Sequence, residues 1–481
     1  MYRNEYDAIV VGSGPNGLSA AITMQQQGLS VLLLEGRDSI GGGLRSAELT
    51  LPGFVHDVCS AIHPMALTSP FLKTLPLEQF GLSYIYPAAD AAHPFDDGTA
   101  AVLYSSLEKT AQLLGEDCVT YERLYAPLLK DFPELMAEVL GPLKVPKHPL
   151  VMARFGLKAL PSALQLARRF KGKAARGLFG GIAAHSIQPL SNVATAAIGL
   201  VLSLNSHAGG WPVPRGGAQS LANALADYFV YLGGEIQTNT YVKTLSELPP
   251  ARAILLDVTP KQLLSIAGER FSSFYKWQLQ RYRYGMGIFK ADWALAAPIP
   301  FTAAGCREAG TVHLGNTIEE IAASELQTSR GQHPEKPFVL LAQQSIVDNT
   351  RAPKGKHTAW AYCHVPNGST KDMTAVIEDQ VERFAPGFKD LILGRHVMNT
   401  AEMESYNPNY IGGDINGGVI DISQLYTRPA IRLSPYSTPA RGVYICSSST
   451  PPGGGVHGMC GYYAAKKALK DVFGLRIFLS N

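Results

Sequence analysis

The chain has 481 residues, of which 46% are hydrophobic and 17% charged, so we expect a globular protein of two or three domains rather than a disordered one. Its formal net charge of +3 identifies no partner by itself. The six scattered cysteines form no C-x-x-C pair and no signal peptide is recognisable, which predicts reduced thiols and a cytoplasmic location. No apolar run approaches the ~20 residues that a transmembrane helix needs.

The first strand and turn of the chain carry its clearest signal. Tyr6–Val11 is an apolar, β-branched run, which is typical of a buried parallel strand. It leads directly into Gly12-Ser13-Gly14-Pro15-Asn16-Gly17, a G-x-G-x-x-G turn, and then into a helical stretch that Gly28 ends. Ser30–Leu34 predicts a second buried strand, which ends at Glu35.

Each residue of this turn has a physical role in binding a dinucleotide. Gly12 permits the tight turn, Gly14 lets the backbone approach a pyrophosphate, and Gly17 lets the helix pack on the strand. The pyrophosphate then lies at the helix N-terminus, where Pro15 gives up an amide that has no helical partner. Glu35 is placed to bind the adenosine ribose and disfavours a 2′-phosphate. We therefore predict dinucleotide binding rather than a purely structural turn.

A second glycine cluster follows this acid. Gly41, Gly42 and Gly43 allow another close approach of the backbone, and Arg45 adds a fixed positive charge, an extension typical of FAD proteins; a flexible surface loop is the alternative. The following segment, residues 51 to 64, carries His56, Asp57, Cys59 and His63 among apolar residues. Their spacing matches no zinc pattern, so we expect no metal site and interpret the segment as a loop that covers the cofactor.

Two insertions interrupt the predicted dinucleotide-binding domain. Within the first insertion, Ala101–Tyr104 predicts a strand, and Leu107–Leu114 and Cys118–Leu140 predict amphipathic helices. The second insertion contains strand-like runs such as His357–Val365. We expect residues 1–74, 205–284 and 441–481 to form the first domain, and residues 75–204 and 285–440 to form an α+β substrate domain with a mixed or antiparallel sheet.

One part of the first insertion has an unusual charge pattern. No Asp or Glu occurs from Val139 to Ala226, and the segment 144–176 is basic, helical and rich in large apolar residues. Such a composition suits an anionic membrane surface, and a solvated basic face is the alternative. We expect no nucleic acid partner, because no recognition motif accompanies the charge.

Later segments predict the remaining elements of the first domain. Pro214-Arg215-Gly216-Gly217 precedes a helix over 219–232, and Glu235–Val242 and Ala251–Val258 predict strands. Near the C-terminus, a strand over Gly442–Ser448 leads through a proline- and glycine-rich turn into a helix over His457–Leu469. In flavoproteins the dipole of such a helix stabilises negative charge on the flavin as it accepts a hydride.

These motifs together resemble the phytoene desaturase-like branch of FAD-dependent oxidoreductases, which is related to flavin amine oxidases. The resemblance covers nearly the whole chain and rests on the N-terminal fingerprint, the PRGGAQSLANAL segment and the terminal TPPGGGVHGMCGYYAA segment. It implies a discontinuous, Rossmann-like FAD-binding domain of the glutathione reductase type. It also implies a set of cofactor-binding residues: Gly12, Gly14, Pro15, Asn16, Gly17, Glu35, Gly42, Gly43, Arg45, Val242, Gly454, Gly455, Val456 and Met459.

Within this set the resemblance places Glu35 at the adenosine ribose, Gly12–Gly17 and Arg45 at the pyrophosphate, and the backbone of Val242 on the adenine side. It places Gly454, Gly455, Val456 and Met459 beside the flavin. It further implies that the enzyme removes a hydride from an apolar substrate, such as a polyene, an isoprenoid or an acyl compound. A saturase, an isomerase and an amine oxidase remain alternatives on the same site, and a non-catalytic protein like the Rab GDP-dissociation inhibitors is a further one.

His457 is the best placed acid–base candidate in the sequence, because it follows Gly455-Val456 at the start of the last helix; a packing role is the alternative. The chain has a single dinucleotide fingerprint, so we expect no NADPH domain. Electrons would then leave to oxygen, to a quinone or to another acceptor linked to the membrane.

Overall fold

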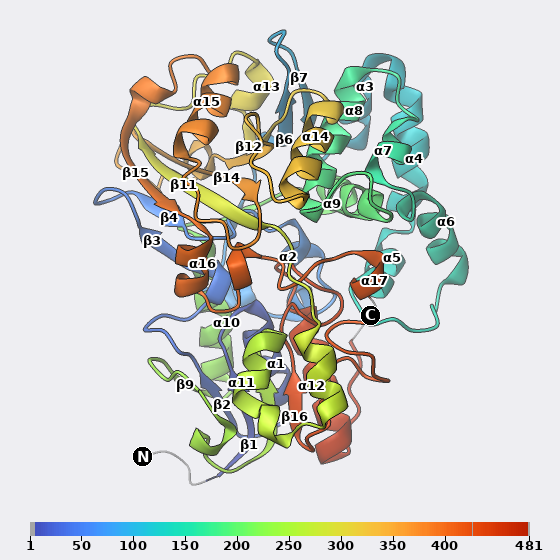
Figure 1. The fold of residues 1–481 in the computed structure, drawn as a ribbon, viewed down its shortest axis with the longest axis vertical. Coiled ribbons are helices and arrows are strands. Elements are labelled where there is room, and N and C mark those ends of the chain that lie inside the picture. Colours follow the sequence, from blue (N-terminus) through green and yellow to red (C-terminus); the bar gives the residue numbers. More distant parts are fainter. Residues whose placement is uncertain (1–4, 426, 480–481) are drawn as a thin grey trace.

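The computed structural model describes residues 5–425 and 427–479. These residues form two lobes, each built around its own sheet, and Figure 1 shows the lobes stacked along the long axis of the molecule. The lobe drawn at the bottom contains a five-stranded sheet, and the lobe at the top contains a seven-stranded sheet. None of the helices in these residues combines the length and apolarity that crossing a membrane requires.

The lower sheet is parallel throughout, in the order β16-β10-β1-β2-β9. Its strands are β1 (Tyr6–Val11), β2 (Val31–Leu34), β9 (Glu235–Gln237), β10 (Ala251–Leu256) and β16 (Val443–Ile445). Helices α1 (Pro15–Gln25), α10 (Ala218–Tyr231) and α18 (Met459–Ala468) share a core with Ala8 and Val10, whereas α11 (Pro260–Ala267) and α12 (Ser273–Gln280) share one with Tyr6 and Ile9. Both faces are therefore covered, as apolar parallel strands require, and the predicted Rossmann-like fold is confirmed.

The upper sheet is mixed, in the order β15-β11-β14-β13-β12-β6-β7. Its strands are β6 (Ala89–Pro94), β7 (Ala100–Leu103), β11 (Gly287–Leu295), β12 (Ala309–Leu314), β13 (Val339–Ala342), β14 (His357–Val365) and β15 (Ile392–Met398). All neighbouring pairs are antiparallel except β12 and β6. One face packs against α13 (Ala304–Arg307) and α15 (Thr374–Phe384).

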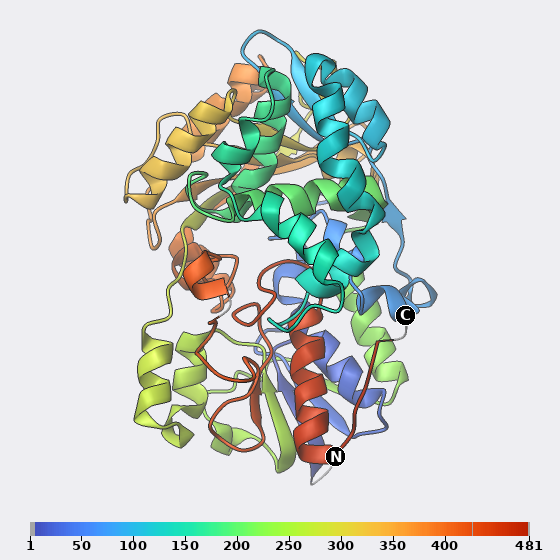
Figure 2. The ribbon, with the colours of Figure 1, turned by 90° about the vertical axis from the view of Figure 1, so that its right-hand side faces the viewer.

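The helices of the first insertion lie beside this sheet, as Figure 2 shows. They are α3 (Leu107–Leu113), α4 (Cys118–Lys130), α5 (Phe132–Val139), α6 (Pro149–Ala159), α7 (Ala163–Ala167), α8 (Lys173–Ala183) and α9 (Thr195–Gly209). The single helix predicted over Cys118–Leu140 is wrong, because the chain breaks at Asp131: Pro133 has no amide to donate to the carbonyl of Leu129, and it lies in the first turn of a new helix instead. The domain boundaries stay a prediction, although the one at residue 205 falls inside α9.

The remaining helices are short or flank the upper sheet: α2 (Pro64–Thr68), α14 (Ile318–Ser329), α16 (Thr400–Tyr406) and α17 (Ile422–Leu425). Two short sheets pair β3 (Ser46–Glu48) with β4 (Val55–Asp57) and β5 (Tyr84–Ile85) with β8 (Val213–Pro214). The strand predicted over Glu235–Val242 stops at Gln237, because Asn239 adopts a left-handed conformation with φ +54°. This turn carries Val242 towards the end of β2, where Thr240 donates its amide to the carbonyl of Glu35.

Candidate functional site: a cofactor turn and a substrate chamber

A cavity of about 390 Å³ runs between the two lobes. At one end it is lined by the turn that follows β1, and at the other by side chains of the upper sheet. The carboxyl ends of parallel strands form the usual binding edge of a doubly wound sheet. The cavity begins at that edge, since Val11, Glu35 and Asp257 follow or end three neighbouring strands.

The G-x-G-x-x-G turn has the backbone geometry that the sequence predicts. Gly12 has φ +100°, and a Cβ on Gly17 would lie 1.9 Å from the carbonyl oxygen of Gly12. Gly14 caps α1, Pro15 occupies its first turn, and the first turn contains no acidic residue. Asn16 lines the cavity as well, and its buried Oδ1 forms no hydrogen bond within the described residues. The turn therefore fits a dinucleotide pyrophosphate.

Glu35 and Arg45 are both buried and lie together at this turn. A carboxylate oxygen of Glu35 accepts a hydrogen bond from the Ser13 amide at 3.1 Å, and the other lies 3.1 Å from the guanidinium of Arg45. Arg45 also donates to the carbonyl of Ser39 and stacks over Tyr406. Arg45, which is predicted to contact the pyrophosphate, is thus held in place by Glu35, which is predicted to bind the ribose.

The second glycine cluster packs directly on the first. Gly42 has φ +55°, and a Cβ there would lie 3.0 Å from Cα of Gly14. A Cβ on Gly43 would lie 2.6 Å from the hydroxyl of Tyr410. Both glycines line the cavity, and so do Tyr241 and Val242. The two clusters therefore form a single cradle, as the sequence indicates.

The C-terminal turn meets the cavity through Gly454, Gly455 and Val456. Gly455 has φ +125°, and a Cβ on it would lie 2.1 Å from Cε of Met65, so the backbone approaches the cavity closely. Met459 and Gly17 do not reach the cavity wall among the described residues. They support the wall from behind instead: Met459 begins α18, whose Gly461 packs against the backbone of Asn16.

The structure does not place His457, the sequence candidate for catalysis, in the cavity wall. Its side chain is buried, and its Nδ1 accepts a hydrogen bond from the amide of Met459 at 3.0 Å. The helix begins at Met459 rather than at His457, because Gly458 adopts φ +67°. Burial lowers the pKa of His457 to about 4. This geometry favours the packing role over the catalytic one.

Asp257 is a cavity residue to which the sequence analysis assigned no role. It follows β10, is buried in the turn, and accepts a hydrogen bond from the amide of Gly17 at 2.9 Å. Burial raises its pKa to about 7, the amide of Gly17 opposes the shift, and the charge of Glu35 adds to it. Its position at the carboxyl end of a predicted parallel strand was the signal that could have identified it.

The four polar residues of the segment 51–64 separate into different environments. Cys59 and His63 line the cavity, as a covering loop predicts, whereas His56 bonds Thr50 at 2.8 Å. Asp57 pairs with the fully buried Arg351 at 2.6 Å. The described residues contain no group of three or more His, Cys, Asp or Glu side chains arranged to hold a metal ion.

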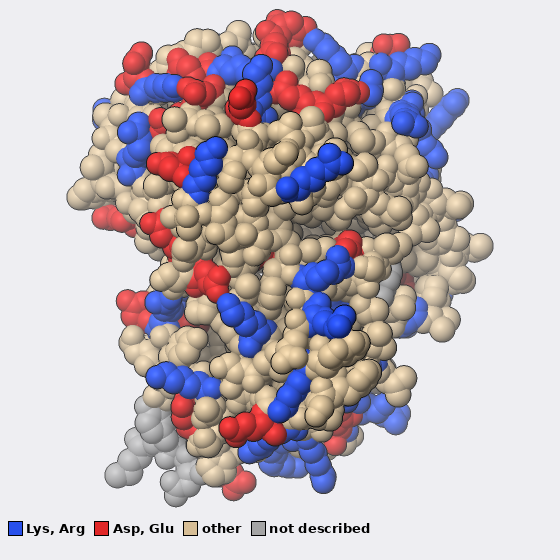
Figure 3. Space-filling model, in the orientation of Figure 1, with Lys and Arg blue, Asp and Glu red and all other residues tan. Residues whose placement is uncertain are grey.

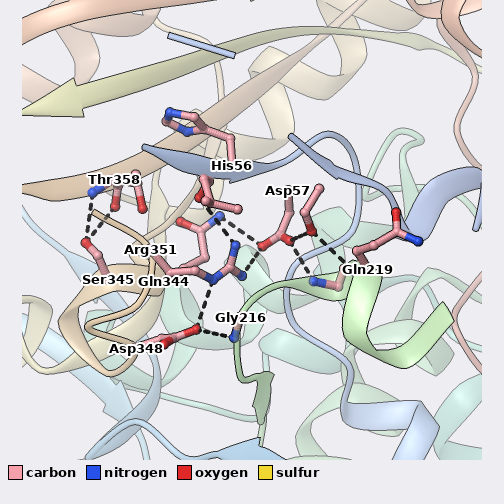
Figure 4. Close-up of polar contacts among 12 residues, drawn as sticks. His56, Asp57, Gly216, Gln219, Gln344, Ser345, Asp348, Arg351 and Thr358 are labelled. Atoms are coloured by element: carbon pink, nitrogen blue, oxygen red, sulfur yellow. Dashed lines mark hydrogen bonds and ion pairs between the residues drawn. The ribbon is translucent and has the colours of Figure 1, made fainter. Parts of the chain in front are cut away.

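Figure 4 shows that Arg351 joins three segments of the chain. Its guanidinium binds Asp57, and its Nε donates to Asp348 at 3.0 Å. These carboxylates also accept hydrogen bonds from the turn before α10: Asp57 from the amide of Ala218, and Asp348 from the amide of Gly216, each at 2.7 Å. The two carboxylates thus find their cation and their hydrogen-bond donors inside the protein, and this helix start is closed to a ligand.

The far end of the cavity forms what we term the substrate chamber. Its wall consists of apolar, aromatic and neutral polar side chains: His63, Met65, His185, Ile187, Leu202, Trp211, Thr311, Leu340, Trp360 and Tyr362. The rings of Trp360 and Tyr362 stack with centroids 5.7 Å apart. None of these residues is an acid, and the acids that line the cavity, Glu35 and Asp257, lie at the dinucleotide turn. The chamber therefore suits an uncharged substrate.

A parallel, doubly wound lobe with a two-part glycine cradle and a mixed-sheet lobe over it define a flavin-dependent oxidoreductase. Residues 16–262 match the family model of flavin-containing amine oxidoreductases, and the chain belongs to this family. Its cofactor is FAD, and the residues of the cradle fit that cofactor. When bound, FAD supplies an acceptor for a hydride.

Similar proteins cover nearly the whole chain. Pyridine nucleotide-disulfide oxidoreductase domain-containing protein 2 of Mus musculus is 25% identical, over 98% of this chain and 94% of that protein. A limonene dehydrogenase subunit of Castellaniella defragrans is 23% identical, over 98% of this chain and 96% of that protein. The crystal structure of an oxidoreductase from Methanosarcina mazei superposes with a TM-score of 0.64 at 14% identity, over 96% of this chain and 99% of that one.

Proposed function

We propose that this oxidoreductase is a dehydrogenase that removes a hydride from an uncharged, largely apolar small molecule. The observation that carries the proposal is the continuity of the cavity from the FAD cradle into a substrate chamber without an acidic wall residue. A polyene, an isoprenoid or an acyl compound meets this requirement. The similarity to the limonene dehydrogenase of Castellaniella defragrans, whose name refers to an isoprenoid hydrocarbon, supports the same substrate class.

An amine oxidase is the second candidate, since the family is named for amine substrates. A protonated amine needs a carboxylate or an aromatic face to offset its loss of solvation. The stacked rings of Trp360 and Tyr362 offer such a face, but the buried ammonium of Lys290 already lies 5.3 Å from the Trp360 ring centroid. Lys290 is itself paired with Asp292, and the chamber wall offers no carboxylate to a bound ammonium, so amines rank below apolar compounds.

Anaerobic mixing with candidate substrates tests the proposal. Limonene and longer isoprenoids should bleach the oxidised flavin band of the FAD-loaded protein without added reductant, and a primary alkylamine should not. NADPH alone should not bleach the band at a useful rate, because Glu35 is committed to the FAD site. Rapid, saturable bleaching by NADPH would point to a saturase, and bleaching by the amine alone would favour the amine oxidase. We propose oxygen or a quinone as the acceptor that re-oxidises the flavin.

We further propose a location in the cytoplasm at an anionic membrane surface, which would give access to such substrates. The loop before α6 and α6 itself expose Leu143, Val145, Leu150 and Leu157, each at least 70% exposed. Figure 3 shows few charges on the right-hand edge of the molecule, where Figure 1 places α6. Exposed leucines beside lysines and arginines are the composition that binds a membrane interface.

Fewer basic side chains of this region are unpaired than the sequence indicates, because acids from outside the acid-free segment 139–226 form ion pairs with several of them. Lys144 meets Glu138 at 3.2 Å, and Arg154 meets Asp131. Membrane binding would therefore depend on the leucines more than on net charge. Replacing Leu150 and Leu157 with Glu should abolish co-sedimentation with vesicles that contain phosphatidylglycerol, and Leu113→Glu on α3, which is also exposed, should not. Unchanged sedimentation of the double variant would contradict the proposal.

A further inference from the structure

A pair of histidines connects the substrate chamber to the buried interior of the upper lobe. His185, which follows α8, lines the chamber, and its Nε2 lies 2.8 Å from Nε2 of His313 on β12. His313 is fully buried, and its Nδ1 forms no hydrogen bond within the described residues. The rings meet edge to face with centroids 4.9 Å apart. The contact is direct and excludes water between the two nitrogens.

The glycines of α8 make room for this contact. A Cβ on Gly181 would lie 2.8 Å from Cβ of His313, and one on Gly177 would lie 2.8 Å from the ring of His93 on the neighbouring strand β6. Gly177 and Gly181 lie one helical turn apart on the same face, and His185 follows one turn later. The glycine-rich run of α8 thus brings a helix close enough to the sheet for His185 to reach His313.

The pair can present either a donor or an acceptor to the chamber. Burial lowers the pKa of His185 to about 3 and that of His313 well below its usual value, so both rings are neutral at physiological pH. Between two neutral imidazoles one Nε2 donates and the other accepts. When His185 donates, its Nδ1 is an acceptor, and that nitrogen has no partner among the described residues.

We propose that His185 is the proton acceptor for substrate oxidation, that His313 positions it, and that the substrate is a hydrophobic alcohol. This inference rests on the proposed function. In the reaction the C–H hydrogen leaves as a hydride to FAD, and the O–H hydrogen moves as a proton to Nδ1 of His185. The N–H at Nε2 of His185 stays hydrogen-bonded to Nε2 of His313, and the carbonyl double bond forms. Atoms and electrons balance, with His185 left as an imidazolium.

Other side chains of the chamber are less suited to this task. His63 is buried and lines the chamber, but neither of its ring nitrogens has a hydrogen-bond partner within the described residues that would fix its tautomer. Burial raises the pKa of Tyr362 above its usual value, so its phenol stays protonated. The other titratable groups around the pair are His93 and His364, and His364 is bonded to Glu325 at 2.8 Å. They sit behind the pair, away from the residues that line the chamber.

The test uses the FAD-loaded protein and two matched probes, geraniol and geranyl methyl ether, which differ in the hydroxyl proton. Geraniol should bleach the flavin anaerobically and the ether should not. The rate should be level from about pH 5 to about pH 9, because His185 is already neutral there. His185→Gln should retain FAD and slow bleaching by ~10²-fold or more in the limiting rate. His207→Gln, a change on α9 away from the chamber, should match the wild type.

Two variants of His313 separate positioning from packing. His313→Gln keeps a group that can bond Nε2 of His185 and should stay within a few-fold of the wild-type rate. His313→Phe removes that group and should slow bleaching by ~10-fold or more with FAD content unchanged. Failure of geraniol to bleach a protein that holds FAD, or a His185→Gln variant as fast as the wild type, overturns the inference. Bleaching by limonene but not by geraniol overturns the inference and keeps the proposed function; a protein that cannot hold FAD overturns both.

Discussion

Two glycine-rich turns lead into helices of the lower lobe. One of them lines the cavity, and the other is bound by side chains of the protein. The turn before α1 contains Gly12 at φ +100°, and the turn before α10 contains Gly216 and Gly217 at φ +81° and +124°. The amides at the start of α10 and in the turn before it are bound by Asp57, Ser46 and Asp348, whereas the turn before α1 lines the cavity. A glycine turn therefore fixes the path of the backbone, and the side chains that fold onto it decide whether a ligand can bind.

The carboxylates at the two turns differ in the same way. Burial alone would raise the pKa of Asp57, but the charge of Arg351 and the hydrogen bonds to Asp57 hold it below its usual value. Asp257 has no cation paired with it in the described residues, and burial raises its pKa to about 7. The carboxylates of the closed turn thus have a cation and amide donors of the protein as partners, without a ligand. The open turn keeps a carboxylate that resists ionisation, which leaves its helix dipole available for an added anion.

The largest effect is expected at the open turn. Gly17→Ala places a Cβ 1.9 Å from the carbonyl oxygen of Gly12, so the strand and the helix must separate and FAD binding should be lost. Gly156→Ala in α6 is the control, because its Cβ would meet nothing within 4 Å, and it should bind FAD normally. Flavin absorbance after reconstitution measures both variants. Normal FAD content in Gly17→Ala would show that the strand and the helix can separate without loss of FAD binding, contrary to what the geometry of the turn indicates.

The next effect is expected at the closed turn. Arg351→Met leaves two buried carboxylates without their cation, and breaking such a pair costs about 3–5 kcal/mol. The surface pair of Lys467 and Asp471 offers the control, since Lys467→Met should change stability by less than about 1 kcal/mol. Thermal and urea unfolding of the FAD-loaded proteins compare the two. Equal stability of both variants would mean that Arg351 does not hold the turn before α10 in place.

A smaller effect, which depends on pH, distinguishes Asp257 from Asp57. A carboxyl whose folded pKa is raised contributes stability below its unfolded pKa, and this contribution is lost as pH rises through the folded value. Apo-protein should therefore lose stability between about pH 4 and about pH 7 relative to Asp257→Asn. Asp57, with a lowered pKa, contributes stability above its unfolded pKa that is lost only as pH falls through the lower folded value.

The raised pKa of Asp257 also predicts how FAD binding responds to pH. A bound pyrophosphate favours the neutral form of Asp257, so FAD affinity should fall by up to about 10-fold per pH unit above about pH 7. Fluorescence titrations with FAD measure this slope in the wild type and in Asp257→Asn, which should show little slope. A parallel pH response in both proteins would assign the proton to another group.

The parts of the site that the sequence predicts are those built from contiguous backbone. The strand, glycines and helix start between Tyr6 and Gly17 are local, and Glu35 and Arg45 follow soon after along the chain. The first domain's strands were recognisable because parallel strands buried on both faces are continuously apolar. The FAD cradle and the fold class therefore follow from local chemistry.

The substrate chamber could not be predicted in this way. Its histidines and aromatics come from β14, from the segments that follow α8 and α9 and from the residue before α2, and no local pattern specifies the order of seven strands. Strands β6 (ADAAHP) and β12 (AGTVHL) carry polar residues that are buried only because other segments supply their partners. His457 was adjacent to the cavity in sequence, but a left-handed Gly458 directs its ring to the amide of Met459.

The smallest effects are expected when one hydroxyl is removed at each of the two turns. These substitutions test the comparison of the turns most directly. Ser46 donates to Asp57 at 2.7 Å and accepts from the amide of Gln219, so Ser46→Ala should cost about 1 kcal/mol of stability. FAD affinity should stay unchanged, because that turn does not line the cavity. Ser13 donates to Glu35 and accepts from the amide of Gly41 inside the cradle, so Ser13→Ala should weaken FAD binding by ~10-fold. Calorimetry and FAD titration on both variants give four values, and the comparison fails if Ser46→Ala lowers FAD affinity as much as Ser13→Ala does.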